Sequence, residues 1–258
     1  MGVPRSTRRR VGPARPFDEE SESTMFLFGF DPTFMLLIPA LIFAMWAQHR
    51  VQSTYQQWAR VRAANGRTGR EMALEIMARN GISGVAVEET GGTLSDHYDP
   101  RTRKVALSPP VYEGDSIASI AVAAHEVGHV LQHHEGYSPL AIRSAVAPVA
   151  QIGSFAAFPL FFIGIFFFRG HGPVAGLLMD LGIWFFTGAV LFQLVTLPVE
   201  FDASRRALAQ LTATGAVMPQ EVDGARKVLN AAALTYVAAA AMAALQLMRL
   251  LLIRNSRN

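Results

Sequence analysis

Residues 120–132 read Ile-Ala-Val-Ala-Ala-His-Glu-Val-Gly-His-Val-Leu-Gln, an apolar run that holds the motif His-Glu-x-x-His. The run favours a helix, on which residues four apart lie on one face. His125 and His129 could therefore bind a single metal ion. Glu126 follows the first histidine directly, so its carboxylate could reach a water bound to that ion. This combination is typical of zinc peptidases.

A hydrolytic zinc site has three protein ligands and keeps one position for water, so the motif needs a third ligand. His133 is unsuitable, because it would spread the ligands along about 12 Å of helix axis. Metzincins have glycine and histidine at the positions that Gln132 and Glu135 occupy here, which excludes that class. Glu135 itself lies near the helix end without a glycine turn to bring it back. Glu200 is the better candidate, with a surface carboxylate or a favourable charge at a helix N-terminus as the alternatives.

The composition is that of a membrane protein. Of the 258 residues, 51% are hydrophobic and only 17% are charged, which is unusual for a soluble chain. The chain has no cysteine, so a metal must be held by histidine and carboxylate ligands. The net charge is only +3, and the arginines gather beside apolar runs. This distribution suits membrane flanks and argues against a nucleic-acid partner.

Four apolar stretches are long enough to cross a bilayer as helices, at residues 25–47, 147–168, 174–197 and 231–253. A signal peptide is the alternative for the first, but its length and the acidic residues upstream favour a retained anchor. The division that we predict is a disordered tail 1–24, a transmembrane anchor 25–47, a catalytic region 48–146, transmembrane helices 147–254 with the third-ligand helix at 198–214, and a tail 255–258. Two crossings separate the motif from Glu200, so both should lie on one face of the membrane.

The catalytic region has ordinary soluble composition. We predict helices at 51–64 and 68–80, strands at 85–88 and 104–108, a polar loop at 96–100, and the motif helix from about Ser116 to Gly136. The strands suggest a small sheet whose edge could pair with an extended peptide. The predicted fold class is a mainly α membrane protein with about four transmembrane helices and a small α+β, zincin-like catalytic region.

The orientation follows from the charges near the spans. The arginines of the N-terminal tail are followed by Asp18, Glu19, Glu20 and Glu22, which dilute their positive charge. Positively charged segments favour the cytoplasmic side of a membrane. We therefore expect the catalytic face in the cytoplasm and the C-terminus outside.

Four separated motifs carry a family resemblance. They are Leu-Ser-Asp-His-Tyr-Asp-Pro-Arg at 94–101, Ala-Ala-His-Glu-Val-Gly-His at 123–129, Leu-Pro-Val-Glu-Phe-Asp-Ala-Ser-Arg-Arg at 197–206 and Ala-Ala-Leu-Thr-Tyr at 232–236. In this order they resemble the YugP-like family of bacterial membrane-bound neutral zinc metallopeptidases. The resemblance implies a Zn²⁺-dependent peptidase of the bacterial plasma membrane. It also implies His125, His129 and Glu200 as zinc ligands and Glu126 as the catalytic base.

A more distant similarity is to the membrane gluzincins of the CAAX prenyl protease and HtpX type. In these, an aspartate follows the glutamate ligand by four residues, whereas this chain has Ser204 at that place. The carboxylate expected to orient a ligand histidine must then come from elsewhere or be absent. Asp202 is near in sequence, but its place two residues after Glu200 on a helix should point it away.

The hypothesis is a membrane-embedded zinc endopeptidase. A zinc-activated water attacks the peptide carbonyl while Glu126 acts as general base and returns the proton to the leaving amine. His97, in the predicted polar loop, is the first candidate for the donor to the oxyanion, followed by Tyr98, Tyr137 and Arg205. The expected partners are a protein or peptide substrate and the lipid bilayer.

Two other classes of function remain open. A catalytically silent pseudo-peptidase could serve as a membrane scaffold, but a scaffold would not need the carboxylate of Glu126. A metal-dependent membrane hydrolase could act on a non-peptide substrate, although the predicted strand edge favours a peptide.

Overall fold

The computed structural model describes residues 32–92, 95–168, 172–219 and 221–256. The predicted N-terminal tail and the first part of the predicted anchor lie outside these ranges. The elements are, in chain order, the 3₁₀ helix η1 (Pro32–Leu37), α2 (Ile38–Trp58), α3 (Gly69–Arg79), β1 (Ala86–Glu89), β2 (His97–Asp99), β3 (Lys104–Leu107), α4 (Pro109–Tyr112), α5 (Ile117–His134), α6 (Ser138–Phe166), α7 (Pro173–Ala213) and α8 (Val222–Asn255).

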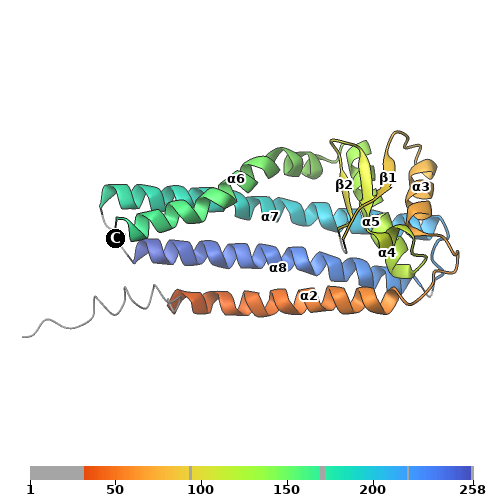
Figure 1. The fold of residues 1–258 in the computed structure, drawn as a ribbon, viewed down its shortest axis with the longest axis horizontal. Helices are drawn as coiled ribbons and strands as arrows, with labels where there is room; N and C mark the ends of the chain where they lie inside the picture. The colour runs from red at the N-terminus through yellow and green to blue at the C-terminus, as the bar shows by residue number, and fades with distance from the viewer. Residues whose placement is uncertain (1–31, 93–94, 169–171, 220, 257–258) are drawn as a thin grey trace, which may run out of the picture.

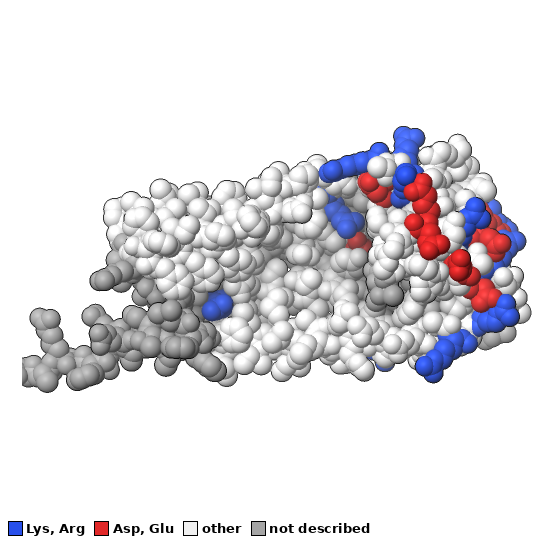
Figure 2. Space-filling model, viewed as in Figure 1, with Lys and Arg blue, Asp and Glu red and all other residues white. Residues whose placement is uncertain are grey.

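Long helices lie side by side, and the sheet, α3, α4 and α5 gather at one end of them (Figure 1). α7 packs against α5, α6 and α8, and α2 packs against α8. As the sequence predicts, four helices are long and apolar enough to cross a membrane: η1 with α2, then α6, α7 and α8. Figure 2 shows charged side chains concentrated at the end that carries the sheet, and a largely uncharged surface along the helices. This arrangement suits a catalytic segment at the bilayer surface.

The long helices are more continuous than the sequence suggests. The pattern predicts a span that ends near residue 197 and a separate helix at 198–214, whereas α7 runs unbroken from Pro173 to Ala213. Pro198 removes one backbone donor from the helix interior, but packed membrane helices tolerate such a loss. α6 likewise begins at Ser138, well before the predicted span. The segment that links α5 to the membrane is therefore itself helical.

Two predictions in the catalytic region need correction. The predicted helix at 51–64 belongs to α2 and ends at Trp58, because the following residues pair with the start of α5. Ile117 N–H donates to the carbonyl of Val61, and Ala63 N–H donates to that of Asp115, both at 2.9 Å. The predicted loop at 96–100 contains a strand, β2. Its three polar residues are too short a run to show the alternation by which strands are recognised.

The sheet has the strand order β1-β3-β2, so β2 is an edge strand. β1 pairs with β3 in parallel, with Val87 opposite Val105, and β2 pairs with β3 antiparallel, with Tyr98 opposite that same valine. Val105 and Leu107 of β3 are fully buried. The central strand thus anchors the sheet in the core, and β2 keeps one side for other contacts.

The motif helix α5 forms the centre of the core. It begins after Ser116, whose hydroxyl accepts a hydrogen bond from Ser119 N–H at 3.1 Å, as expected of an N-cap residue. Apolar side chains cover most of its circumference, and nearly the whole helix is buried against α3, α7, α8 and the sheet. A helix that is apolar on all sides is stable only when it is surrounded in this way.

Gly128 brings α5 and α7 into close contact. A Cβ atom added at this glycine would lie 2.5 Å from the carbonyl oxygen of Ala203 and 3.1 Å from its Cα. Both of these atoms belong to the backbone of a packed helix, so neither can move without displacing α7. The glycine therefore sets the distance between the two helices one residue before His129.

Gly128→Ala should lower the free energy of unfolding by about 1–3 kcal/mol, the usual cost of overpacking a tight contact. The matched control is Gly188→Ala on α7, where an added Cβ meets nothing within 4 Å; this variant should be as stable as the wild type or slightly more so. Thermal unfolding in detergent, followed by circular dichroism, measures both. Equal midpoints for Gly128→Ala and the wild type would contradict the account of this contact.

Candidate metal centre

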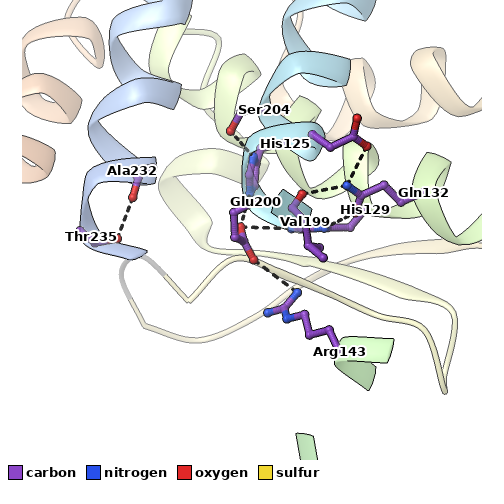
Figure 3. Close-up of polar contacts among 10 residues, drawn as sticks. His125, His129, Gln132, Arg143, Val199, Glu200, Ser204, Ala232 and Thr235 are labelled. Atoms are coloured by element: carbon purple, nitrogen blue, oxygen red, sulfur yellow. Dashed lines mark hydrogen bonds and ion pairs between the residues drawn. The ribbon is translucent and has the colours of Figure 1, made fainter. Parts of the chain in front are cut away.

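Three predicted ligands meet at the contact between α5 and α7. His125 and His129 of α5 and Glu200 of α7 offer ligand atoms that all lie within 4.8 Å of one another. Nε2 of His125 is 3.2 Å and Nε2 of His129 is 3.5 Å from the same carboxylate oxygen, Oε2 of Glu200 (Figure 3). His129 and Glu200 are buried, and His125 is half-buried. Two imidazole nitrogens and one carboxylate oxygen form a donor set that zinc commonly takes.

The outer nitrogen of each histidine has its own partner. Nδ1 of His125 lies 3.1 Å from the hydroxyl of Ser204, and Nδ1 of His129 lies 3.0 Å from Oε1 of Gln132. These contacts fix both rings with Nε2 toward Glu200, which is how ligand histidines are usually held. Ser204, at the place of the aspartate of the distant gluzincins, thus contacts a candidate ligand histidine through a neutral hydroxyl.

Asp202 lies closer to the site than its place on the helix suggests. The long side chain of Gln132 reaches across from α5, and its amide donates to Oδ2 of Asp202 at 2.9 Å. Asp202 also pairs with Arg205 and Arg206, and Arg206 pairs with Glu135 at 2.6 Å. The position of Asp202 on α7 does not by itself indicate this contact, because the contact depends on Gln132 of α5.

The second oxygen of Glu200 faces a cation that the sequence did not identify. Oε1 is buried and has no hydrogen-bond partner within the described residues, but Nη1 of Arg143 on α6 lies 3.3 Å from it (Figure 3). A buried carboxylate oxygen without a hydrogen bond is suited to interact with positive charge. Arg143 lacks any motif spacing, so only the course of α6 reveals its place.

The four predicted oxyanion donors lie around the cluster and have other contacts. His97 is exposed on β2, where its Nδ1 lies 2.8 Å from the carbonyl oxygen of Ser95. The hydroxyl of Tyr98 is 2.7 Å from Nδ1 of His133, which places His133 outside the ligand group. Arg205 pairs with Asp202, and the ring of Tyr137 stacks under Arg206. His97 and Tyr98 are thus on the edge strand that faces the motif helix.

Glu126 is buried beside the ligands, with 7% of its surface exposed. Burial raises the pKa of its carboxyl above the ordinary value, and the charges of Glu200 and Asp96 act in the same direction, although His125 and His129 oppose the shift. In the metal-free protein the carboxyl therefore keeps its proton to a higher pH than an ordinary glutamate does. A carboxylate with a raised pKa is also a better proton acceptor.

The raised pKa predicts how the stability of metal-free protein depends on pH. The protonated form of Glu126 stabilises the fold fully below the unfolded-state pKa, and this contribution is lost as the pH rises toward the folded-state pKa. Glu126→Gln cannot ionise, so its melting temperature should exceed that of the wild type by a margin that grows from pH 4.5 to pH 8. Each unit of pKa difference corresponds to about 1.4 kcal/mol.

Thermal unfolding in the presence of a chelator measures this margin, with Glu113→Gln as the control at an exposed site. The difference in melting temperature between this control and the wild type should be the same at every pH, because the side chain of residue 113 is in water before and after unfolding. A margin for Glu126→Gln that is constant or shrinks with rising pH would refute the assignment.

Comparisons with known proteins agree with the geometry. The model of a family described as "Putative neutral zinc metallopeptidase" matches residues 33–255. The chain is also 48% identical over 220 residues to a Bacillus subtilis (strain 168) protein named "Putative membrane protease YugP", an alignment that covers 84% of this chain and 94% of the relative. No solved structure matches the chain.

Proposed function

Because the chain belongs to the "Putative neutral zinc metallopeptidase" family, we propose that it is a membrane-embedded zinc endopeptidase. The observation that carries the proposal is the cluster of His125, His129 and Glu200, whose ligand atoms converge next to the buried Glu126. Zinc is the metal that the family implies. The cluster suits it, because each histidine is held at Nδ1 and directs Nε2 toward the carboxylate of Glu200.

In the proposed mechanism, His125, His129 and Glu200 would hold the zinc ion, which when bound would supply a Lewis acid that lowers the pKa of water. Glu126 accepts the proton of the attacking water and passes it to the leaving amine. Its burial suits this role, because a carboxylate removed from bulk solvent takes up a proton more readily. Arg143 balances the charge of Glu200 at the oxygen that faces away from the histidines.

The edge strand β2 is the proposed binding site for the substrate backbone. It is at the edge of the sheet and contacts α5 through Tyr98 and His133. A peptide in extended form could pair with this strand and present its carbonyl to the ligand cluster. His97, on the same strand, is the proposed donor to the oxyanion. A position at the membrane surface is supported by the four helices that are long and apolar enough to cross a membrane, because the site lies at one end of them (Figure 1).

A scaffold without catalytic activity explains the site less well. Keeping a carboxyl group buried costs stability when the group must ionise, and burial raises the pKa of Glu126. A peptidase needs this carboxylate as a base, whereas a scaffold gains nothing from it.

Glu126→Gln separates the two functions. The wild type should bind one zinc ion per chain and cleave a casein-type substrate. The variant should bind zinc equally well and cleave at least about 100-fold more slowly, the usual effect of removing a general base. As a control for metal dependence, Glu200→Gln should lose zinc affinity and activity together. Zinc binding by both wild type and Glu126→Gln without any cleavage would support the scaffold, and equal cleavage would refute the mechanism.

We further propose that the catalytic end faces the cytoplasm. α8 begins at the catalytic end and runs to the opposite end of the helices, where the chain terminates (Figure 1). The C-terminus should therefore lie outside. A C-terminal reporter that works only in the cytoplasm should be inactive, and the same reporter inserted in the loop before α3 should be active. The opposite pattern would overturn the orientation.

A further inference from the structure

The side-chain amide of Gln132 forms hydrogen bonds with both α7 and His129. The side chain is fully buried. Its nitrogen donates to the carbonyl of Val199 at 2.8 Å and to Oδ2 of Asp202 at 2.9 Å. Both protons of the amide are thus used, so its oxygen must face Nδ1 of His129, 3.0 Å away. His129 then carries its proton on Nδ1 and presents the lone pair of Nε2 to the ligand cluster.

The same amide connects a buried carboxylate to that histidine. Asp202 is 6% exposed, and its Oδ2 accepts from both Gln132 and Nε of Arg206. Its negative charge polarises the amide, and the amide oxygen in turn accepts the proton of His129 more strongly. Among the described residues His125 has no comparable contact, because its Nδ1 meets the hydroxyl of Ser204. The carboxylate therefore acts on one histidine and not on the other.

The bond to Val199 adds a second constraint. Val199 immediately precedes Glu200, so one buried side chain positions His129 on α5 and the carboxylate ligand on α7. Hydrogen bonds of this kind are strong in a buried site but fail together when one partner is lost.

We propose that Gln132 is a positioning residue that couples the carboxylate of Asp202 to His129, so that zinc affinity depends on the pair as a unit. This inference rests on the proposed zinc site but not on peptide hydrolysis. Asp202 then provides the carboxylate that orients a ligand histidine, and it acts through the amide of Gln132 instead of by direct contact.

The test is a double-mutant cycle on the dissociation constant of zinc, measured by chelator competition with purified full-length protein in detergent. Gln132→Met keeps the size of the side chain and removes the amide. Gln132→Met and Asp202→Asn should each weaken zinc binding about 10- to 100-fold, the range found for outer partners of zinc ligands. The double variant should bind zinc no more weakly than Gln132→Met alone, because the path from Asp202 is already broken.

A second part of the test uses a variant in which Asp202→Asn should have the opposite effect on zinc affinity. Gln132→Glu provides an acceptor for His129 but cannot donate to Asp202, and the two carboxylates repel each other. Adding Asp202→Asn supplies a donor amide and removes the repulsion. Asp202→Asn should therefore weaken zinc binding in the wild type and strengthen it in the Gln132→Glu variant. A residue that only supported the fold would lower affinity in both backgrounds.

Gln210→Met is the matched control, since Gln210 lies on α7 and bonds to Asn80, away from the ligands. It should leave zinc affinity unchanged, and circular dichroism should show equal helix content in every variant. The proposal would be overturned if Gln132→Met and Asp202→Asn weakened zinc binding independently of each other. It would also be overturned if Asp202→Asn did not strengthen zinc binding in the Gln132→Glu variant. A wild type that binds zinc but cleaves no peptide would refute the proposed function and leave this cycle intact.

Discussion

The close contact between α5 and α7 is the constraint on which the rest of the structure depends. α5 provides both histidines and Glu126, and α7 provides Glu200, so the candidate ligand group exists only while these two helices touch. Gly128 permits the contact, because no larger residue fits against the backbone at Ala203. A site divided between helices far apart in sequence needs such a rigid contact, since small displacements of ligands weaken a metal site.

The interface also has to accommodate charge in a buried place. Glu200, Asp202 and Glu126 are all buried, and buried charges are costly unless they are paired. The histidines and Arg143 surround Glu200, while Gln132 and two arginines satisfy Asp202. Among the described residues Glu126 has no ion pair, and burial raises its pKa although His125 and His129 oppose the shift. Of these three acids, the one whose pKa is raised is the one that the proposed reaction requires to take up a proton.

Sequence reasoning succeeded where the determining information is local. The spacing of His125 and His129 fixes their geometry on one helix, and the count of apolar spans places Glu200 on the same side as the motif. The four candidate spans could be found because each of these helices contains a long apolar stretch. The family could be recognised because four motifs occur in a fixed order.

Other features depend on contacts that no local pattern records. Arg143 reaches Glu200 only because α6 begins earlier than its apolar run. Asp202 enters the site only because Gln132 is long enough to bridge two helices. β2 is a strand only because β3 lies beside it. In each case the decisive partner is distant in sequence, so the side chain alone gives no signal.

The central claim is that α5 and α7 together hold one zinc ion, and anomalous diffraction at the zinc edge tests it most directly. Crystals of zinc-loaded Glu126→Gln protein should show one strong anomalous peak between His125, His129 and Glu200, with ligand distances of about 2.0–2.2 Å. A peak bound by α5 alone, with Glu200 turned away, would contradict the account, as would a peak elsewhere in the molecule.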